Sequence, residues 1–312
     1  MLQLDAQALA KLLDRPSLIN ALDEAFRSHI TVPLRHHHTL AETDARDSTL
    51  LLMPAWDDHT YIGIKTVTVV PRNSEQNQAA VQGTYLLLDR RTGTPIAVMD
   101  GTEITARRTA AASALAARYL AREDATHLLM VGTGVLAPHL IKSHLAVRPL
   151  TRVSIWGRDF DKAKAVAATF GDMDLDVQAV SSLQDSVATA DIISCATLSQ
   201  EPLIKGDWLV AGQHLDLVGA FTPHMRETDD NAIRRARVYV DTPAAITEAG
   251  EISQPIAHGI LALSDIQGNL FTLANGKAPL RQSADEITLF KSAGTAIEDL
   301  AAARLAYERD GG

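Results

Sequence analysis

From about residue 50 to residue 100, the apolar positions fall in short runs separated by turn residues, as in Arg91-Thr92-Gly93. Such runs are typical of strands joined by tight turns, so this part is predicted to form an antiparallel meander. The predicted strands cover residues 50–53, 61–70, 81–89 and 95–99. The next stretch, 103–121, is rich in Ala, Leu and Arg and predicts a helix.

After Arg122, short apolar runs alternate with stretches of helical spacing. Strands are predicted at 127–131, 152–156, 175–180, 191–196, 214–219 and 238–241. Helices fit between most of these strands, for example at 136–146 and 160–170. Alternating strands and helices indicate a parallel sheet with right-handed crossovers, as in a Rossmann domain.

A last helix is predicted over residues 292–309. The apolar residues with helical spacing in it are Ile297, Leu300, Ala301 and Leu305. This stripe needs a packing partner, and we expect the helix to return to the first domain.

The predicted fold is therefore α/β, with two domains. A Rossmann dinucleotide-binding domain is expected over residues 121–289. Residues 1–120 and 290–312 are expected to form a discontinuous α+β domain, with an antiparallel or mixed sheet, for substrate binding and dimerisation.

The composition of the 312-residue chain narrows the class of protein. A hydrophobic content of 46% is that of a globular protein, and the length suits two domains. The formal charge of −9 argues against a nucleic-acid partner, because a phosphate backbone needs a cationic surface. A single cysteine, Cys195, rules out an internal disulfide and a cysteine-based zinc cluster.

The sequence also argues against a membrane partner. Eighteen consecutive apolar residues occur nowhere in it, so a spanning helix is not expected. The first residues carry acids and lack a long apolar core, which does not fit a signal peptide. We therefore expect a cytoplasmic protein.

The first strand of the second half leads into a GxGxxA sequence and then a helix. Gly132 permits a tight turn, Gly134 lets the backbone approach a pyrophosphate, and Ala137 allows close packing of the helix. The helix N-terminus supplies amide donors to the anion. This strand-turn-helix context predicts a nicotinamide dinucleotide site. The chain residues expected to contact the cofactor are Gly132, Thr133, Gly134, Val135, Leu136, Gly157, Arg158 and Thr197.

The end of the second strand bears on the choice of cofactor. NAD enzymes usually carry an acid there, about 20 residues after the glycines, to bind the ribose 2′-hydroxyl. This chain has Arg158 instead, which suits a 2′-phosphate and favours NADPH over NADH. Asp159 and Asp161 keep NADH open, and a merely solvated Arg158 is a further alternative.

In the strand predicted at 61–70, the period of two places Lys65 on the same face as Tyr61 and Val67. Burying an unpaired ammonium is costly. Lys65 must therefore reach water, as on an edge strand, or meet a negative group. An anionic substrate would supply that group.

Arg107 and Arg108 stand near the N-terminus of the helix at 103–121, where the helix dipole disfavours cations. A bound anion would explain them, and a carboxylate matches the guanidinium fork. The alternative is a salt bridge to Glu103, which applies better to one arginine than to both. Arg35 is a weaker candidate of the same kind.

The run His36-His37-His38 looks like a metal site, but adjacent residues on an extended segment point to opposite faces. A spaced set of further ligands is missing from the sequence, so we expect no metal. Cys195 lies inside an apolar strand and is expected to be a small buried residue. The chain has neither a GxSxG elbow nor a P-loop, which argues against hydrolases and kinases.

Several ordered motifs together resemble the ornithine cyclodeaminase/mu-crystallin family over nearly the whole chain. These motifs are Gly63-Ile64-Lys65, Thr105 to Ser113 with Arg108, Gly132-Thr133-Gly134, Val218 to Pro223 with Met225-Arg226-Glu227, and Thr288 to Ser292 with Gly294 and Glu298-Asp299.

This resemblance implies a homodimer that pairs through the sheets of the first domain, with a substrate cleft between that domain and the Rossmann domain. It places Lys65 and Arg108 against the substrate, with Arg35 as another carboxylate-binding arginine. It also brings Ser292 near the nicotinamide end of the cofactor.

Two departures from the cyclodeaminase pattern argue against ornithine cyclisation. Leu51-Leu52-Met53-Pro54 stands where the lyase has an acid in Glu-Leu-Met-Pro, and Phe221 stands where it has a catalytic Asp. The segment 219–223 is more similar to that of the family's cyclic ketimine reductases. These enzymes reduce Δ1-pyrroline-2-carboxylate to L-proline and Δ1-piperideine-2-carboxylate to L-pipecolate.

The resulting prediction is an NADPH-preferring reductase of cyclic imino acids, with NADH as the other cofactor left open. The predicted catalytic residues are Lys65 and Arg108, and the predicted substrate-binding residues are Arg35, Lys65, Arg108, Phe221 and Thr222. Three alternatives stay open: an ornithine cyclodeaminase, an alanine-dehydrogenase-like amino-acid dehydrogenase, and a non-catalytic NADPH-dependent carrier like mu-crystallin.

Overall fold

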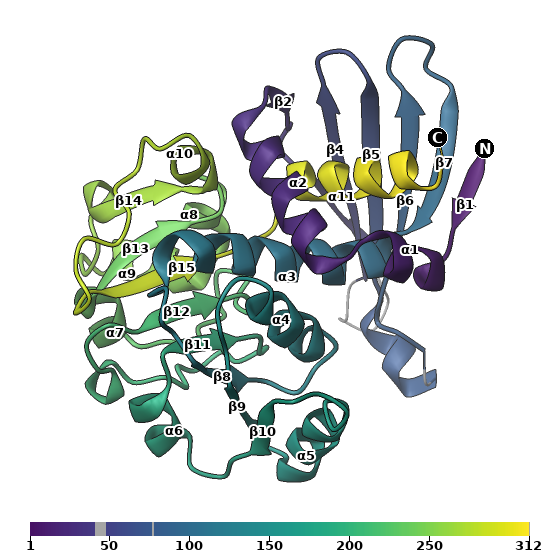
Figure 1. The fold of residues 1–312 in the computed structure, drawn as a ribbon. Coiled ribbons are helices and arrows are strands. Elements are labelled where there is room, and N and C mark those ends of the chain that lie inside the picture. The colour runs from purple at the N-terminus through teal and green to yellow at the C-terminus, as the bar shows by residue number, and fades with distance from the viewer. Residues whose placement is uncertain (41–47, 77, 312) are drawn as a thin grey trace. The chain divides into compact units, whose positions relative to one another are not determined.

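The structure, a computed structural model, describes residues 1–40, 48–76 and 78–311. It divides into two compact units (Figure 1). The first unit comprises Met1–Arg108 and Thr295–Gly312, and the second comprises Thr109–Gly294. The long helix α3 (Gly101–Leu120) begins in the first unit and continues into the second.

The first unit is built on a mixed sheet of seven described strands in the order β1-β7-β6-β5-β4-β2, with β3 pairing β4. β4 to β7 form the expected antiparallel meander, and β1 runs parallel to β7. The strands are β1 (Leu2–Leu4), β2 (Ile30–Thr31), β3 (His36–Leu40), β4 (Ser48–Asp57), β5 (Tyr61–Val69), β6 (Val81–Asp89) and β7 (Pro95–Asp100).

Three helices complete this unit together with the start of α3: α1 (Ala6–Leu12), α2 (Arg15–Arg27) and α11 (Ala296–Arg309), and η1 (Pro71–Gln76) is a 3₁₀ turn. Asp5 and Asp14 cap α1 and α2 by accepting hydrogen bonds from first-turn amides. α11 packs against α2, β4 and β5 (Figure 1). It starts at Ala296 and not at Ser292 as predicted, because Gly294 takes a φ of +76° and interrupts the helix before it.

The second unit has a parallel sheet of eight described strands in the order β10-β9-β8-β11-β12-β15-β13-β14, the Rossmann-type sheet that the alternation predicts. The strands are β8 (His127–Val131), β9 (Arg152–Trp156), β10 (Asp176–Ala179), β11 (Ile192–Cys195), β12 (His214–Leu217), β13 (Ala236–Val240), β14 (Ile266–Asn269) and β15 (Ile287–Lys291).

Helices connect most of these strands: α4 (Leu136–Leu145), α5 (Phe160–Ala168), α6 (Leu183–Thr189), α7 (Asp230–Arg235), α8 (Ala245–Glu248), α9 (Gly250–Ala257) and α10 (Leu270–Ala274), with 3₁₀ turns η2 (Gly206–Trp208) and η3 (Leu263–Asp265). In the described part of the chain, every helix is too short or too polar to cross a membrane.

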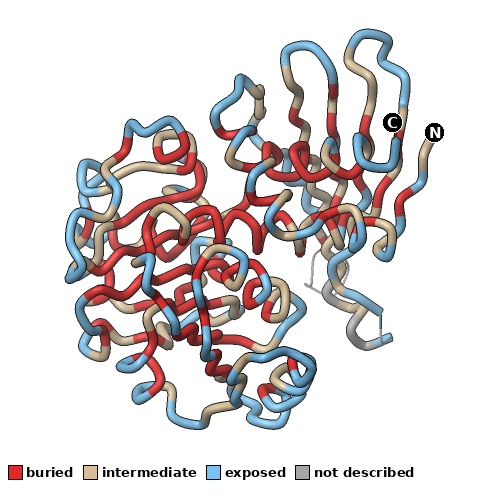
Figure 2. Tube along the Cα trace, viewed as in Figure 1, coloured by how far each residue is buried: buried red, intermediate tan, exposed pale blue. Residues whose placement is uncertain are grey.

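The central strands of the second sheet are buried on both faces, as the red segments of this unit in Figure 2 show. Leu128 and Met130 of β8 belong to one apolar cluster, and Leu129 and Val131 belong to another. Because successive residues of a strand point to opposite faces, the two clusters cover the two faces of the sheet. This leaves the strand ends as the place for polar chemistry.

Candidate active site

A pocket of about 1090 Å³ lies at the carboxyl ends of β8, β9 and β11 in the second unit. β8 and β11 are neighbours in the sheet, and the chain continues from them in opposite directions, so this is the topological switch point where such folds bind ligands. The pocket is lined by Gly132, Thr133, Gly134, Trp156, Gly157, Arg158, Asp159, Lys162 and residues 196–201 and 203.

The glycines of the GxGxxA sequence meet the demands of a dinucleotide site. Gly132 has a φ of +121°, and a Cβ there would lie 2.5 Å from the carbonyl oxygen of Ala196. A Cβ at Gly134 would meet only open space. Ala137 is buried in the first turn of α4, which follows at once. The turn therefore leaves room for a pyrophosphate beside the N-terminus of a ten-residue helix.

Gly157, Arg158 and Asp159, which follow β9, line the same pocket. A Cβ at Gly157 would come within 2.7 Å of Thr133 Cγ2, so glycine lets these two loops approach. Arg158 lines the pocket. Asp159 Oδ1 accepts hydrogen bonds from the amides of Asp161 (3.0 Å) and Lys162 (3.2 Å) as the N-cap of α5.

The other residues of the second unit that were predicted to contact cofactor or substrate lie in loops directly after strands of the sheet. Thr197 lines the pocket after β11. Phe221 and Thr222 stand in the loop after β12, and Phe221 is 52% exposed. Ser292 is buried directly after β15, and its amide donates to the carbonyl of Leu217 (3.1 Å).

The first unit holds a buried cluster of charges around Lys65 of β5, which is 1% exposed. Its Nζ lies 2.9 Å from Asp299 Oδ1 and 2.8 Å from Oδ2, and it donates to Thr105 Oγ1 at 3.2 Å. Burial lowers the pKa of Lys65 to about 8, although the charge of Asp299 acts in the opposite direction. β5 lies inside the sheet between β4 and β6, so the edge-strand alternative for Lys65 is wrong.

Arg108 of α3 joins the same cluster. Its Nη1 donates to Glu298 Oε2 at 2.5 Å, and its Nε lies 2.9 Å from Asp299 Oδ1. Glu298 and Asp299, in the first turn of α11, are both fully buried. We expected a substrate anion to balance Lys65 and Arg108. Among the described residues, the chain's own carboxylates pair with them, two anions with two cations.

The neighbouring arginine has a different environment. Arg107 pairs with Glu103 one turn earlier and donates to the carbonyl of Leu13 (3.0 Å). The salt-bridge alternative to Glu103 therefore holds for Arg107 and not for Arg108. Arg35 lies half-buried in the segment between β2 and β3.

The candidates set aside in the sequence have ordinary surroundings. His36, His37 and His38 form the exposed strand β3. Across residues 1–40, 48–76 and 78–311, groups of three or more His, Cys, Asp or Glu that suit a metal ion are absent. Cys195 is fully buried as expected, and burial raises the pKa of its thiol well above its usual value.

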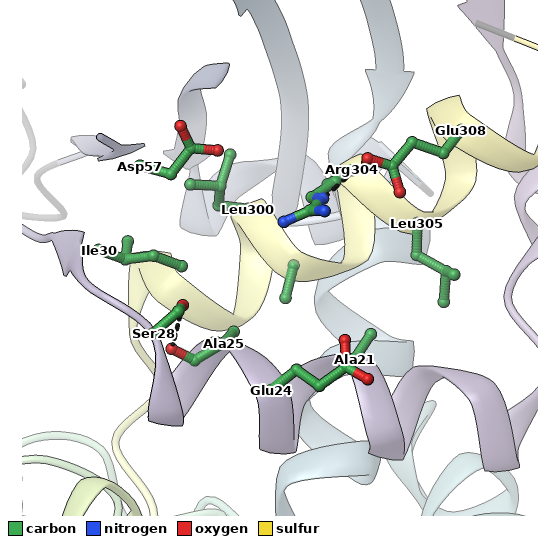
Figure 3. Close-up of a pocket in the computed structure, with 11 residues that line it drawn as sticks. Ala21, Glu24, Ala25, Ser28, Ile30, Asp57, Leu300, Arg304, Leu305 and Glu308 are labelled. Carbon is green, nitrogen blue, oxygen red and sulfur yellow. Dashed lines mark hydrogen bonds and ion pairs between the residues drawn. The ribbon is translucent and has the colours of Figure 1, made fainter. Parts of the chain in front are cut away.

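A smaller cavity of about 270 Å³ lies between α2 and α11 of the first unit (Figure 3). Arg304, which points into it, is paired with Glu308 at 2.8 Å. Glu24 and Asp57 add two acidic groups to the lining. This charge pattern does not suit an anionic substrate, so we assign the cavity no part in the proposed reaction.

Comparison with known proteins bears on the family of the chain. Residues 2–311 match the model of the ornithine cyclodeaminase/mu-crystallin family. A Δ1-pyrroline-2-carboxylate reductase of Colwellia psychrerythraea is 38% identical to this chain over 311 residues, with 98% of each chain covered.

Two solved structures share the fold. The Thermococcus litoralis Δ1-pyrroline-2-carboxylate reductase in complex with NADH and L-proline has a TM-score of 0.93 and 32% identity, with 99% of this chain and 97% of that one covered. An archaeal alanine dehydrogenase dimer with bound NAD has a TM-score of 0.91 and 28% identity, with coverages of 99% and 95%. The family resemblance seen in the motifs is confirmed: this chain belongs to the ornithine cyclodeaminase/mu-crystallin family.

Proposed function

We propose that the protein is an NAD(P)H-dependent reductase of cyclic ketimine 2-carboxylates. Its substrates would be Δ1-pyrroline-2-carboxylate, giving L-proline, and Δ1-piperideine-2-carboxylate, giving L-pipecolate. The observation that carries the proposal is the similarity along 99% of the chain to a reductase whose structure holds NADH and L-proline. The glycine turn at Gly132 and Gly134 and the buried Lys65–Asp299–Arg108 cluster supply the parts that such a reaction needs.

The charge balance of the first-unit cluster suits a particular form of the substrate. Lys65 and Arg108 are offset by Glu298 and Asp299, so the charges of these four described residues sum to zero. A cyclic imine 2-carboxylate protonated on nitrogen is also formally neutral. It offers a carboxylate to Arg108 and an iminium to the carboxylates, so it can bind without leaving a buried charge unbalanced.

The predicted catalytic and substrate-binding residues then have roles in the reduction. Reduced nicotinamide, when bound, supplies the hydride that the imine carbon accepts. Arg108 binds the substrate carboxylate, with Arg35 as a second arginine for it. Lys65, whose pKa is about 8, holds a proton at Nζ near neutral pH and can donate it to the nitrogen of a bound imine that is not yet protonated, which leaves Lys65 neutral and the imine electrophilic. Phe221 and Thr222 border the ring of the substrate, and Phe221 offers no base for deamination.

We propose that the protein prefers NADPH to NADH. Arg158 lines the pocket, while one carboxylate oxygen of Asp159 is engaged in capping α5. The side chain of Asp161 is paired with Lys164. The acids that would bind a ribose 2′-hydroxyl are thus engaged locally, whereas a guanidinium remains at the pocket wall for a 2′-phosphate.

We further propose that the protein acts as a cytoplasmic homodimer that pairs through its first unit. The archaeal alanine dehydrogenase of similar fold is a dimer. Light scattering after size exclusion checks this, because a mass equal to one chain of 33.6 kDa would contradict it.

A substrate panel tests the activity. Purified protein is supplied with each of the two cyclic imines, and with NADPH or NADH, while the absorbance of the reduced nicotinamide is followed. We expect oxidation of NADPH in step with formation of the cyclic amino acid. If neither cofactor is oxidised with either imine, the proposed function is wrong.

The similarity to an alanine dehydrogenase makes an amino-acid dehydrogenase the second candidate. That enzyme class would reduce an open-chain 2-oxo acid only when ammonia is supplied. A cyclic imine already contains its nitrogen, so its reduction should not depend on ammonia. Repeating the panel with 2-oxo acids, with and without ammonium, separates the two activities.

A further inference from the structure

A fully buried carboxylate, Glu227, stands behind the nucleotide pocket in the segment between β12 and α7. Its Oε1 accepts hydrogen bonds from the amide (2.7 Å) and the hydroxyl (2.9 Å) of Thr197. Its Oε2 accepts a hydrogen bond from the amide of Gly219 at 2.9 Å. One side chain therefore joins the loop after β11 to the loop after β12.

The two loops meet too closely for a side chain between them. A Cβ at Gly219 would lie 2.0 Å from the carbonyl oxygen of Thr197 and 2.6 Å from Glu227 Oε1. Thr197 lines the pocket, and Gly219 begins the loop that carries Phe221 and Thr222. The contact thus joins a wall of the cofactor pocket to the loop we assign to the substrate.

The backbone around Glu227 holds the same pocket loop along its length. The Glu227 carbonyl accepts from the amide of Leu203 (2.9 Å), and the amide of Arg226 donates to the carbonyl of Ser199 (3.1 Å). Leu203 and Ser199 both line the pocket. Backbone hydrogen bonds from segment 226–228 therefore hold the pocket-lining loop after β11 in position.

Two further buried ionisable residues lie near Glu227. Glu251 of α9 accepts hydrogen bonds from the amides of Glu227 (2.6 Å) and Thr228 (3.1 Å). Lys291, fully buried at the end of β15, donates to the carbonyl of Leu217 at 2.9 Å, and its charge acts on Glu227 and Glu251. Such an arrangement is costly to bury and is retained where geometry must be held closely.

A buried carboxylate within the sheet of the same unit lacks these links to the pocket. Asp216 lies within β12 and accepts from Ser194 Oγ (2.7 Å), with His144 Nε2 at 3.2 Å. These three residues are not among those that line the pocket. Asp216 therefore serves as a control for the effect of removing a buried charge from this unit.

We propose that Glu227 is a positioning residue that holds Thr197 in the cofactor pocket and ties it to the loop at 219–222. This inference rests on the proposed function, because it assumes that the pocket binds the nicotinamide cofactor. Glu227→Gln keeps the size of the side chain but turns one acceptor into an NH₂ group. That group would face an N–H donor of Thr197 or Gly219, so the hydrogen bond from Glu227 to one of the two loops is lost.

The test measures the dissociation constant of NADPH by titration calorimetry in the absence of imine, together with the thermal midpoint. We expect Glu227→Gln to weaken NADPH binding by roughly tenfold. Asp216→Asn should lower the thermal midpoint and leave NADPH affinity as in the unchanged protein. The proposal is overturned if Glu227→Gln binds NADPH normally, or if Asp216→Asn weakens binding equally.

A second pair of variants keeps the proposal testable if Glu227→Gln does not fold. Thr197→Val keeps the shape of the side chain and removes the hydroxyl that donates a hydrogen bond to Glu227. Thr197→Ser keeps the hydroxyl. We expect Thr197→Val to weaken NADPH binding and Thr197→Ser to bind nearly normally. Equal affinities in the two variants would contradict the role of this hydrogen bond.

The outcome separates this inference from the proposed function. If the unchanged protein binds NADPH but reduces neither imine, the function is wrong while the effect of Glu227 on binding still stands. If the protein reduces the imines and Glu227→Gln binds NADPH normally, the function stands and the positioning role fails.

Discussion

Lys65 and Arg108 are residues that the sequence marks as unusual, because a cation on a buried strand face or near a helix N-terminus needs an anion. What the sequence does not show is which anion. Asp299 lies 234 positions after Lys65, and Glu298 lies 190 positions after Arg108. Local patterns carry no information on such distant pairs. The motif Glu298-Asp299 was visible as part of a family resemblance, but its contacts come from the fold.

Removing either cation should abolish the reaction and spare cofactor binding. We expect Lys65→Ala and Arg108→Ala to lower kcat/KM for the imine at least about 100-fold. NADPH affinity should stay near that of the unchanged protein. Arg107→Ala is the matched control, because Arg107 pairs with Glu103 outside the cluster, and it should keep most activity. Near-normal kcat/KM in Lys65→Ala or Arg108→Ala would show that the assigned role is wrong.

The pH dependence of the reduction should follow Lys65. If protonated Lys65 is the active form, kcat/KM falls as the pH rises through the pKa of about 8. The negative charge of Asp299 raises that pKa, so Asp299→Asn should move the decline to lower pH, by roughly one unit. Glu308→Gln, which changes an exposed acid on the same helix, should leave the profile in place. An unshifted profile in Asp299→Asn would contradict the assignment.

Arg158 should determine the choice between the two cofactors. Arg158→Ala removes the guanidinium at the pocket wall, so kcat/KM for NADPH should fall roughly tenfold while the value for NADH stays similar. Arg152 is the first residue of β9, the strand that leads to Arg158, and lies at the end of β9 away from the pocket. Arg152→Ala should therefore leave the ratio of the two kcat/KM values unchanged. Equal losses with both cofactors in Arg158→Ala would mean that the arginine does not contact a 2′-phosphate.

At the scale of elements, periodicity predicted the parts with strong alternation and missed others. The meander β4–β7 and strands β8, β9, β11 and β12 were predicted within a few residues. Helices α1 and α2 were not predicted, although Asp5 and Asp14 provide N-cap signals, and Leu18, Leu22 and Phe26 share one buried face of α2. β15 was not predicted as a strand because its sequence, Ile-Thr-Leu-Phe-Lys, shows neither a regular alternation nor a continuous apolar run.

The turn between β8 and α4 allows two substitutions with opposite effects. Gly134→Ala places a Cβ in open space, so stability should hardly change, while the methyl group should obstruct the pyrophosphate and weaken NADPH binding. Gly132→Ala should lower the stability itself, because φ is +121° and the Cβ would meet the Ala196 carbonyl at 2.5 Å. Thermal midpoints and NADPH titrations check both variants. Normal NADPH affinity in Gly134→Ala would argue against a pyrophosphate at this turn.

At the scale of the whole molecule, composition and length predicted a globular protein with two domains, and the hydrophobic pattern predicted its two kinds of sheet. They did not show the strand order of the second unit, where β15 lies between β12 and β13. That order brings residues far apart in the chain together, since the amide of Ser292 bonds Leu217 and the amide of Ala293 bonds Asp241. Strand order is set by packing over the whole sheet, which no local window of sequence contains.

The acid stability of the second unit should depend on Asp216, one of its fully buried carboxylates. Burial raises its pKa, but the hydrogen bonds and charge of His144 and the Ser194 hydroxyl outweigh burial, so the pKa lies below 3.8. A group whose pKa is lower when folded adds stability above its unfolded pKa and loses that contribution as the pH falls through the folded value.

At pH 7, Asp216→Asn should therefore cost about 1–3 kcal/mol of unfolding free energy, measured by urea denaturation. The difference between the unchanged protein and the variant should shrink as the pH falls below 3.8, because protonation then removes the same charge. Asp185→Asn, at an exposed position in α6, is the control and should show a much smaller difference at every pH. A difference for Asp216→Asn that stayed constant with pH would show that its charge does not contribute to folding.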